Sequence, residues 1–204
     1  MEINGNDNLR RDEGGSTPDL SSGRLTYTRF CLDDAQAMFD GWANSEAVAR
    51  WMFIEPGETM EQCWEHLAEI IRKYDDGTQN HRWAIRKDGA CIGTVALFVE
   101  EKHRSGQLAY LLRESQWGHG YMTEAVRAVI RFGFQELGLN RIHADHFIEN
   151  SASGEVMQKA GMHREGVARE KYYKFGTFHD AVCYSILRSD RPKETAAGTD
   201  CPMP

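Results

Sequence analysis

The segment E-S-Q-W-G-H-G-Y-M-T-E, which runs from Glu114 to Glu124, holds the strongest local signal in the sequence. An apolar run ends at Leu112, a loop with two glycines follows, and a helical pattern starts at Tyr121. A loop that leads from a strand into a helix gathers unpaired backbone N–H groups and the positive end of the helix dipole. The segment therefore predicts an anion site that suits phosphate. A tight turn that merely requires Gly118 and Gly120 is the alternative interpretation.

Two common phosphate loops are absent from the sequence. A Walker A loop requires G-x-x-x-x-G-K-[ST], and the chain contains no Gly-Lys-Ser or Gly-Lys-Thr. A dinucleotide-binding fingerprint requires a third glycine where Thr123 stands. The predicted anion site is therefore of another kind.

The pattern of apolar residues around this segment predicts an α/β domain with one mixed sheet. Strands are predicted at residues 25–30, 81–87, 90–100, 108–112, 141–148, 164–173 and 178–187. Helices are predicted after Asp33-Asp34, after the capping box of Thr59 and Gln62, from Tyr121 with Gly138 as its stop, and from Asn150 to Ala160 with Gly161 as its stop. The dipeptide Asp88-Gly89 predicts a tight hairpin between the second and third strands.

The composition restricts the class of partner. The 204 residues suit one domain with tails, and 24 Lys and Arg against 31 Asp and Glu give a net charge of −7. This acidic balance argues against a nucleic acid or an anionic membrane surface as partner. No apolar run approaches the about 18 residues of a membrane span, and Met1 to Leu20 lack the apolar core of a signal peptide. We expect a cytoplasmic protein without a nucleic-acid or membrane partner.

Both ends of the chain are expected to be disordered tails. Residues 1–23 are rich in Asn, Asp, Gly and Ser, and residues 189–204 carry charged and small residues. Such segments bury too little apolar surface to offset the entropy of ordering them. The folded domain is therefore expected at residues 24–188.

No metal site is predicted. His143 and His146 are three positions apart in a predicted strand, so they should point to opposite faces. The cysteines form no C-x-x-C pair, which indicates reduced thiols. They are Cys31, Cys63, Cys91, Cys183 and Cys201.

Residues 117–125, W-G-H-G-Y-M-T-E-A, resemble the acyl-coenzyme A loop of the GNAT N-acetyltransferases. The general pattern of that family is Arg or Gln, two residues, Gly, one residue, then Gly or Ala. Here Trp117 stands at its first position and Met122 at its last. The run is similar to the variant of the ribosomal-protein-alanine acetyltransferases, called the Rim branch below. This likeness implies a site for acetyl-CoA.

The resemblance extends along the chain in the order and spacing of the Rim branch. Residues 150–162 are similar to its N-x-x-S-x-x-V-M-x-K-x-G-F, with Met162 in place of the usual Phe. Further matches lie at Arg24-Leu25, residues 33–35, His179-Asp180 and residues 184–187. The resemblance implies the GNAT fold, in which about four helices flank one mixed sheet of about seven strands whose central strands splay apart.

The resemblance also implies the reaction, in which an acetyl group moves from acetyl-CoA directly to a primary amine without a metal. The strand before the loop would pair its backbone with the pantetheine arm, and the loop would hold the pyrophosphate. The implied cofactor-binding residues are Leu111, Leu112, Trp117, Gly118, His119, Gly120, Tyr121, Met122, Thr123, Asn150 and Ser153.

Ser153 and Tyr172 are the implied catalytic residues. Many GNAT enzymes protonate the departing thiolate with a Tyr, but Met157 stands at that position and cannot donate. In the Rim branch the serine that matches Ser153 takes this role; a helix-capping serine is the alternative. The base is open, because the two carboxylate positions of the branch hold Gln107 and Tyr172. Candidates for the base, directly or through water, are Glu100, Glu101, His146 and Tyr172.

The missing carboxylates bear on the acceptor. At pH 7 a lysine of pKa about 10.4 costs roughly 4.6 kcal/mol to neutralise, whereas an α-amine of pKa about 8 costs about 1 to 1.4 kcal/mol. We therefore expect the acceptor to be the α-amine of a protein N-terminus or a small amine, rather than an internal lysine. Two other functions stay open: an antibiotic or toxin acetyltransferase, and a module that binds acetyl-CoA without turnover. The chain is expected to be a monomer or a homodimer.

Overall fold

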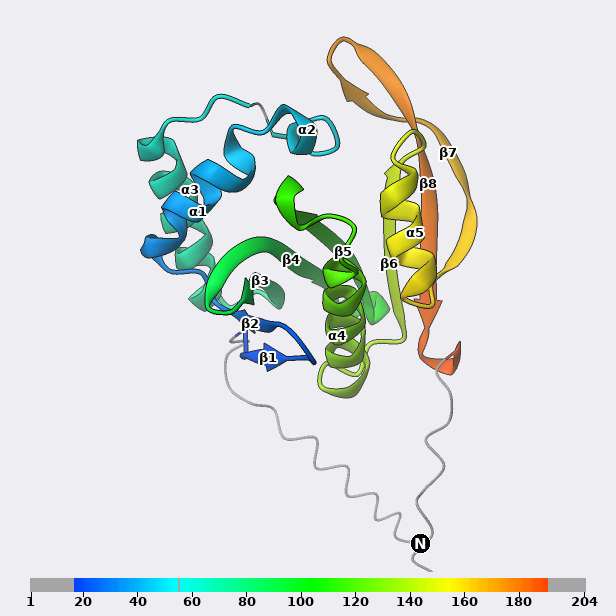
Figure 1. Cartoon of the computed structure of the whole chain (residues 1–204). Helices are drawn as coiled ribbons and strands as arrows, with labels where there is room; N and C mark the ends of the chain where they lie inside the picture. The colour runs from blue at the N-terminus through cyan, green and yellow to red at the C-terminus, as the bar shows by residue number, and fades with distance from the viewer. Residues whose placement is uncertain (1–16, 55, 191–204) are drawn as a thin grey trace, which may run out of the picture.

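The computed structural model describes residues 17–54 and 56–190 (Figure 1). Its strands form one sheet in the order β1-β2-β3-β4-β5-β6-β8-β7. They are β1 (Leu20–Ser21), β2 (Thr26–Thr28), β3 (Asn80–Lys87), β4 (Ala90–Glu100), β5 (Ser105–Leu112), β6 (Arg141–Phe147), β7 (His163–Lys174) and β8 (Thr177–Leu187). Neighbouring strands are antiparallel except β5 and β6, which are parallel and connected by a helical crossover.

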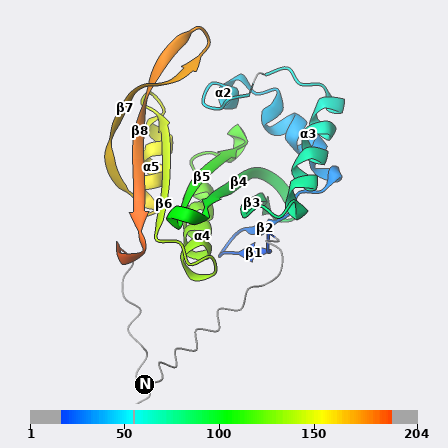
Figure 2. The ribbon, with the colours of Figure 1, turned by 180° about the vertical axis from the view of Figure 1, so that it is seen from behind.

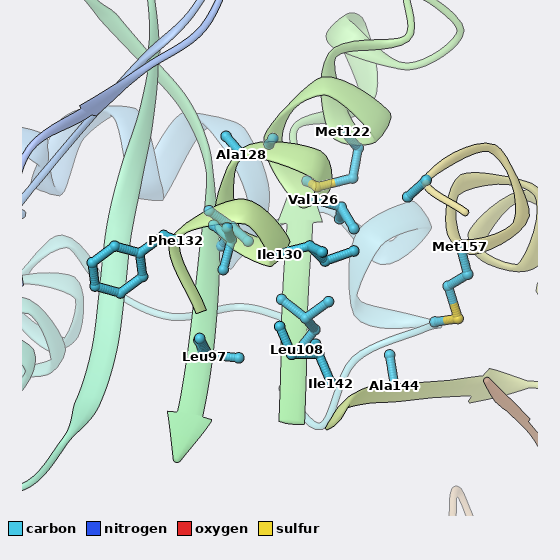
Figure 3. Packing of buried hydrophobic residues seen from close by; sticks show 14 of the residues in the cluster. Leu97, Leu108, Met122, Val126, Ala128, Ile130, Phe132, Ile142, Ala144 and Met157 are labelled. Carbon is cyan, nitrogen blue, oxygen red and sulfur yellow. The ribbon is translucent and has the colours of Figure 1, made fainter. Parts of the chain in front are cut away.

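Helices cover both faces of the sheet. They are α1 (Ala35–Met38), α2 (Glu46–Ala49), α3 (Met60–Arg72), α4 (Tyr121–Gln135) and α5 (Ser151–Lys159). One hydrophobic cluster joins α4 and α5 to the sheet, and a second joins α1 and α3 to the opposite face. Figure 3 shows Val126 and Ile130 of α4 above Leu108 of β5 and Ile142 of β6. We call the two sides the α4–α5 face and the α1–α3 face.

The local signals in the sequence explain where several elements begin and end. Thr59 and Gln62 form the predicted capping box of α3: the Thr59 N–H donates to Gln62 Oε1 at 2.8 Å, and the Gln62 N–H donates to Thr59 Oγ1 at 3.2 Å. Asp88 and Gly89 adopt φ values of 49° and 82° in the β3–β4 turn, which confirms the predicted hairpin. Gly138, after the end of α4, has a φ of 63°.

The N-terminal part of the described chain differs from the prediction. Leu20–Ser21 lie inside the predicted tail of residues 1–23, yet they pair with β2 and bring the sheet to eight strands rather than about seven. The Trp83 indole N–H donates to the carbonyl of Pro18 at 2.6 Å, so a residue far along the chain holds this segment in place. The rest of the predicted tails, residues 1–16 and 191–204, lies outside the described residues.

The helix predicted after Asp33-Asp34 is divided into short pieces. The Asp34 side chain does not cap α1. Its carboxylate instead accepts two hydrogen bonds from Arg86 of β3, each 2.8 Å long, and one from the Cys31 N–H at 3.0 Å. Helix α1 then passes into a π-helical turn at Phe39–Ala43 before α2 begins. The described chain therefore has five α-helices where about four were expected.

Strands β5 and β6 part in the middle of the sheet, as the resemblance implies. Three residue pairs join them, from Ser105 with Arg141 to Gln107 with His143. Beyond Gln107, β5 continues beside β4 as far as Leu112, whereas β6 continues beside β8. In Figures 1 and 2 the upper ends of β5 and β6 diverge, and α2 and the β7–β8 turn lie beyond them. A cavity lies at this gap.

Candidate active site

A cavity of about 540 Å³ lies where β5 and β6 part. It brings together eleven of the twelve residues that the resemblance implies as cofactor-binding or catalytic. These are Leu111, Leu112, Trp117, Gly118, Gly120, Tyr121, Met122, Thr123, Asn150, Ser153 and Tyr172. His119 is not part of the cavity wall; its ring stacks on the Tyr121 ring with centroids 5.5 Å apart. The predicted site is thus one continuous space in the structure.

Backbone groups dominate the loop that leads into α4. Gly120 is the N-cap of α4 with a φ of 76°, Gly118 has a φ of 77°, and no side chain caps the helix. The first N–H groups of the helix are therefore available to a ligand. The Trp117 indole N–H donates to the carbonyl of Leu112 at 2.8 Å and fixes the loop against the end of β5. The geometry suits an anion that needs no basic side chain.

Arg24, which precedes α4 by about a hundred residues in the sequence, holds the start of this helix in place. Its Nε and its backbone N–H both donate to the Glu124 carboxylate at 2.8 Å. The same guanidinium lies over the Tyr121 ring, 4.6 Å from the centroid, and donates to the carbonyl of His119 at 3.1 Å. The turn between β1 and β2 thereby holds the first turn of α4 in position. Sequence reasoning matched Arg24 to the family opening but did not pair it with Glu124.

A second cavity of about 490 Å³ adjoins the first and shares Gly120, Thr123 and Lys159 with it. Four cationic side chains line it: Arg24, Arg127, Arg131 and Lys159. This local positive charge contrasts with the net charge of −7 of the whole chain. Together with the start of α4, it can hold the phosphorylated end of a large anionic ligand.

Ser153 lies one turn into α5 and contacts a tyrosine of β5. The Asn150 side chain caps α5 by accepting the Ser153 N–H at 3.3 Å. The hydroxyl oxygens of Ser153 and Tyr110 are 2.9 Å apart. Burial raises the pKa of Tyr110, so its hydroxyl stays protonated at neutral pH. The Tyr110 hydroxyl also donates to the backbone carbonyl of Ser153 at 3.2 Å, so the Ser153 hydroxyl can donate either to the Tyr110 oxygen or to a third group.

Alternation along β6 sends neighbouring side chains to opposite faces of the sheet. His146 points to α5, where a Cβ on Gly154 would lie 2.7 Å from its Nε2. Asp145 and Phe147 point to the α1–α3 face, where the Phe147 and Phe53 ring centroids are 5.6 Å apart. Residues from both faces line the cavity. Two ligands can thus approach the gap from opposite sides and meet inside the sheet.

The structure separates the four candidates for the base. Glu100 and Glu101 lie at the far end of β4, and neither lines the cavity. His146 Nε2 is buried and has no hydrogen-bond partner among the described residues, and Nδ1 lies 2.7 Å from the carbonyl of Phe147. His146 also lines the cavity, but its Nε2 faces Gly154 of α5, on the side opposite to Tyr172. Of the four, Tyr172 lies on the α1–α3 face of the cavity, beside Asp145.

Asp145 is a buried carboxylate in this part of the cavity wall. Its side chain is 6% exposed and accepts hydrogen bonds from the Tyr172 hydroxyl and, at 2.6 Å, from Lys171 Nζ. Burial, followed by the hydrogen bond to Asp145, raises the pKa of Tyr172 to about 12. Tyr172 is therefore a neutral hydroxyl at pH 7. Sequence reasoning missed Asp145, although an acidic residue between apolar neighbours in a predicted strand is a usable signal.

Lys174 connects the two segments that border this side of the cavity. Its ammonium group donates to the backbone carbonyls of Ala49 and Met52, at the end of α2. The Phe53 ring packs against the Tyr172 ring with centroids 4.8 Å apart. The β7–β8 hairpin and the segment after α2 therefore form one wall, although more than a hundred residues separate them in the sequence.

Three further structural findings concern the described residues alone. They contain no group of three or more His, Cys, Asp and Glu side chains that could hold a metal ion. None of their helices combines the length and the apolar character that crossing a membrane requires. Cys31, Cys63, Cys91 and Cys183 are free thiols, and Cys201 lies outside the described residues.

Sequence comparison agrees with this geometry. A family model described as an acetyltransferase (GNAT) domain matches residues 24–163. A protein described as uncharacterized N-acetyltransferase YoaA, from Bacillus subtilis (strain 168), is 33% identical over 174 residues, which cover 84% of this chain and 97% of that protein.

Two solved structures share the fold. RimJ of Mycobacterium smegmatis, in complex with CoA-disulfide, has a TM-score of 0.78 at 20% identity and covers 88% of this chain and 92% of its own. A spermidine N-acetyltransferase from Vibrio cholerae, in complex with CoA and spermine, has a TM-score of 0.71 at 20% identity and covers 83% of this chain and 98% of its own. At these identities the likeness is one of fold.

The parted sheet, the open start of α4 and these matches define an N-acetyltransferase that uses acetyl-CoA. Within that class, the chain belongs to the GNAT acetyltransferase family. The observed sheet is the mixed GNAT sheet with splayed central strands that the sequence predicted.

Proposed function

We propose that the chain acetylates the α-amine of a protein N-terminus, in the manner of the Rim branch. The observation that carries this proposal is the cavity that crosses the sheet. It has an anion-binding helix start on the α4–α5 face and a polar, aromatic wall on the α1–α3 face. Acetyl-CoA enters from the first side and the amine from the second, so the acetyl group passes directly between them.

The donor half of the proposal uses the residues that the resemblance singled out. The N–H groups from Gly118 to Thr123 bind the pyrophosphate, and the basic second cavity holds the remaining phosphate. Leu112 has no register partner in β6 and its N–H points away from β4, so it can pair with the pantetheine arm. The Leu111 carbonyl faces Gly93 of β4, which leaves Leu111 to contact the arm by its side chain. The proposed donor-binding set is completed by Trp117, Tyr121, Met122, Asn150 and Ser153, with His119 acting from outside by its stack on Tyr121.

The proposed chemistry forms one C–N bond and breaks one C–S bond. The neutral amine attacks the thioester carbonyl, and Ser153 donates its hydroxyl proton to the departing thiolate. Tyr110, whose hydroxyl oxygen lies 2.9 Å from Ser153 Oγ, holds the Ser153 side chain in position for this transfer. The proton that the amine loses passes into water and replaces the one that Ser153 gave. A well-placed general acid contributes about 10²- to 10⁴-fold to the rate.

The acceptor side favours an amine that is easily neutralised. The carboxylate of Asp145 is already paired with Lys171 and accepts a hydrogen bond from Tyr172, so its oxygens are occupied. Tyr172 keeps its proton, since its pKa is raised to about 12 by burial and by Asp145. An α-amine, whose pKa is about 8, needs less help than lysine. This supports the α-amine proposal over acetylation of internal lysines.

The test is detection of acetyl transfer by intact mass. The panel contains peptides with a free N-terminal Ala, Ser or Met, N-blocked peptides with an internal lysine, and spermidine and aminoglycosides. We expect the free N-terminal peptides to gain one acetyl group. Transfer to the small amines alone would move the function to small-molecule acetylation, and efficient transfer to the blocked lysine peptides would refute the preference for an easily neutralised amine.

A further inference from the structure

One of the chain's own ammonium groups, that of Lys171, is bound to Asp145, a residue of the cavity wall, although Lys171 itself does not line the cavity. Lys171 Nζ lies 2.6 Å from Asp145 Oδ2 and 5.1 Å from the centroid of the Tyr172 ring. Burial opposes the charged form, but the hydrogen bond and charge of Asp145 outweigh it and raise the pKa of Lys171. Lys171 is therefore a cation at neutral pH, held by a carboxylate and an aromatic face as an amine ligand would be.

A β-bulge aims Lys171 and Tyr172 at Asp145. The register of β7 against β8 shifts between Ala168 and Tyr172, so three residues of β7 face one residue of β8. Glu170, inside the bulge, has a φ of 51°, and its N–H donates to Asp180 Oδ1 at 2.8 Å. The position of the two side chains is thus built by the backbone and is not a chance surface contact.

We infer that Asp145 and Tyr172 form the binding site for the acceptor's ammonium group, and that Lys171 occupies it until an acceptor displaces it. The inference rests on the proposed function and adds the group that recognises the amine. The Asp145 side chain is 6% exposed and the Lys171 side chain 35% exposed, so the carboxylate is fixed while the lysine can move out into water. We call Asp145 and Tyr172 the ammonium site.

The surroundings of the ammonium site indicate the class of acceptor. Among the described residues that line the cavity, the carboxylates are Asp145 and Glu155. Glu155 is on α5 and is paired with Lys159 at 2.8 Å, on the donor side. The rings of Phe53 and Phe147 border the ammonium site instead. We therefore expect a single primary ammonium group on an apolar body, as in a peptide with an apolar start, and not a polyamine.

The experiment compares two variants of the ammonium site with two matched controls. Lys171→Met removes the competing cation but keeps an apolar stem, and Asp145→Asn removes the carboxylate charge. Lys73→Met and Glu69→Gln break an exposed ion pair of the same 2.6 Å length at the C-terminal end of α3, outside the cavity. The probe is the tripeptide Ala-Leu-Phe amide, with KM measured at saturating acetyl-CoA. Its Kd is measured by calorimetry on protein saturated with desulfo-CoA.

We expect Lys171→Met to lower the tripeptide KM and Kd at least threefold, because the acceptor no longer displaces a cation. Asp145→Asn should raise both at least tenfold, and the two controls should leave both within twofold. A purely structural Lys171 would give the opposite sign, with a raised KM in Lys171→Met. That result overturns the inference.

The two measurements separate this inference from the proposed function. If the wild type acetylates the tripeptide but neither variant shifts KM or Kd, the ammonium site is wrong while the function stands. If the wild type acetylates nothing, the function is wrong, and the Kd values still decide the ammonium site. Asp145→Asn can also lower stability, so the increase in Tm caused by the tripeptide is recorded. This increase should be larger in Lys171→Met than in the wild type.

Discussion

The two sides of the cavity are built in different ways. The donor side consists mainly of backbone groups from one continuous stretch, the end of β5, the loop and the start of α4. The acceptor side consists of side chains from three segments that are distant in the sequence: the residues after α2, strand β6 and the β7–β8 hairpin. Lys174 of the hairpin donates to a carbonyl at the end of α2, and the bulge in β7 directs Lys171 towards Asp145. The donor side thus depends on local conformation, and the acceptor side depends on long-range contacts. Enzymes built this way can change the acceptor without disturbing the donor site.

The largest expected effect concerns Ser153, which lies where the two sides meet. Ser153→Ala should lower kcat about 100-fold or more, because the departing thiolate loses its proton donor. The Kd of acetyl-CoA, measured by calorimetry, should stay within twofold. Ser151→Ala is the control, since Ser151 is exposed at the start of the same helix and does not line the cavity. A wild-type kcat in Ser153→Ala would leave the Ser153 hydroxyl with a structural contact to Tyr110 alone.

A smaller effect is expected from the backbone of the donor side. Gly118→Ala places a side chain at a φ of 77°, which costs about 1–2 kcal/mol unless the loop changes its conformation. We expect the acetyl-CoA KM to rise about tenfold while the KM of the acceptor changes little.

Gly77→Ala is a matched control for this prediction. Gly77 has a φ of 76°, and a Cβ there, as at Gly118, would meet no atom within 4 Å. The control should lose a similar amount of stability but keep its acetyl-CoA KM. Equal kinetic effects in both variants would show that strain anywhere in the chain, and not the anion loop, controls donor binding.

The third prediction concerns the bulge on the acceptor side. Asp180→Ala removes the acceptor of the Glu170 N–H hydrogen bond, so the bulge loses a bond that fixes its conformation and Tyr172 is no longer directed towards Asp145. We expect the acceptor KM to rise about fivefold with an unchanged acetyl-CoA KM, in line with the loss of one charge-assisted hydrogen bond. Asp180→Asn keeps an acceptor oxygen and should restore most of the affinity. Failure of Asn to restore it would mean that the charge of Asp180, and not its hydrogen bond, matters.

The smallest effect is expected from an ion pair away from the cavity. The hydrogen bond from Arg141, helped by Ser185, lowers the pKa of Glu165 to about 2. Because the unfolded value is about 4.3, the pair stabilises the fold above that pH, and this stability is lost as the pH falls towards about 2. The Glu165 side chain is 41% exposed, so solvent screening keeps the contribution small.

Glu165→Gln tests this prediction by thermal melts at several pH values. The wild type should lose more Tm than the variant between pH 5 and pH 3, because the variant has no carboxylate to protonate. Both proteins should have the same KM values at neutral pH. A change in the acceptor KM would indicate that the start of β6, where Arg141 pairs with Glu165, also influences acceptor binding.

The contrast between the two sides explains what could be predicted from the sequence. The loop at residues 117–125 is a local signal, because glycines and helix starts are specified by neighbouring residues. The Asp88-Gly89 hairpin and the Thr59 capping box are local in the same sense and are present in the structure. The order of elements and the mixed sheet followed from these local signals together with the family resemblance.

The acceptor side could not be predicted in this way. Asp145 and Tyr172 meet because of a bulge, and the bulge depends on Glu170 and Asp180, which carry no recognisable pattern. Tyr110 sits on β5 among apolar residues, and its contact with Ser153 depends on how α5 packs against the sheet. The division of the helix after Asp34 depends likewise on Arg86 of β3. In each case the deciding contact joins residues of different elements and not close neighbours in the sequence.

The short ladder between β5 and β6 also affects how the empty protein behaves in solution. From Leu108 to Leu112, β5 has no strand on the β6 side, which leaves a free sheet edge in the middle of the molecule. Such edges recruit extended segments of other chains and start aggregation. A bound pantetheine arm would cover this edge, so we expect stored protein to stay monodisperse longer with acetyl-CoA than without it. Bound acetyl-CoA then prevents association of the protein in addition to serving as a substrate.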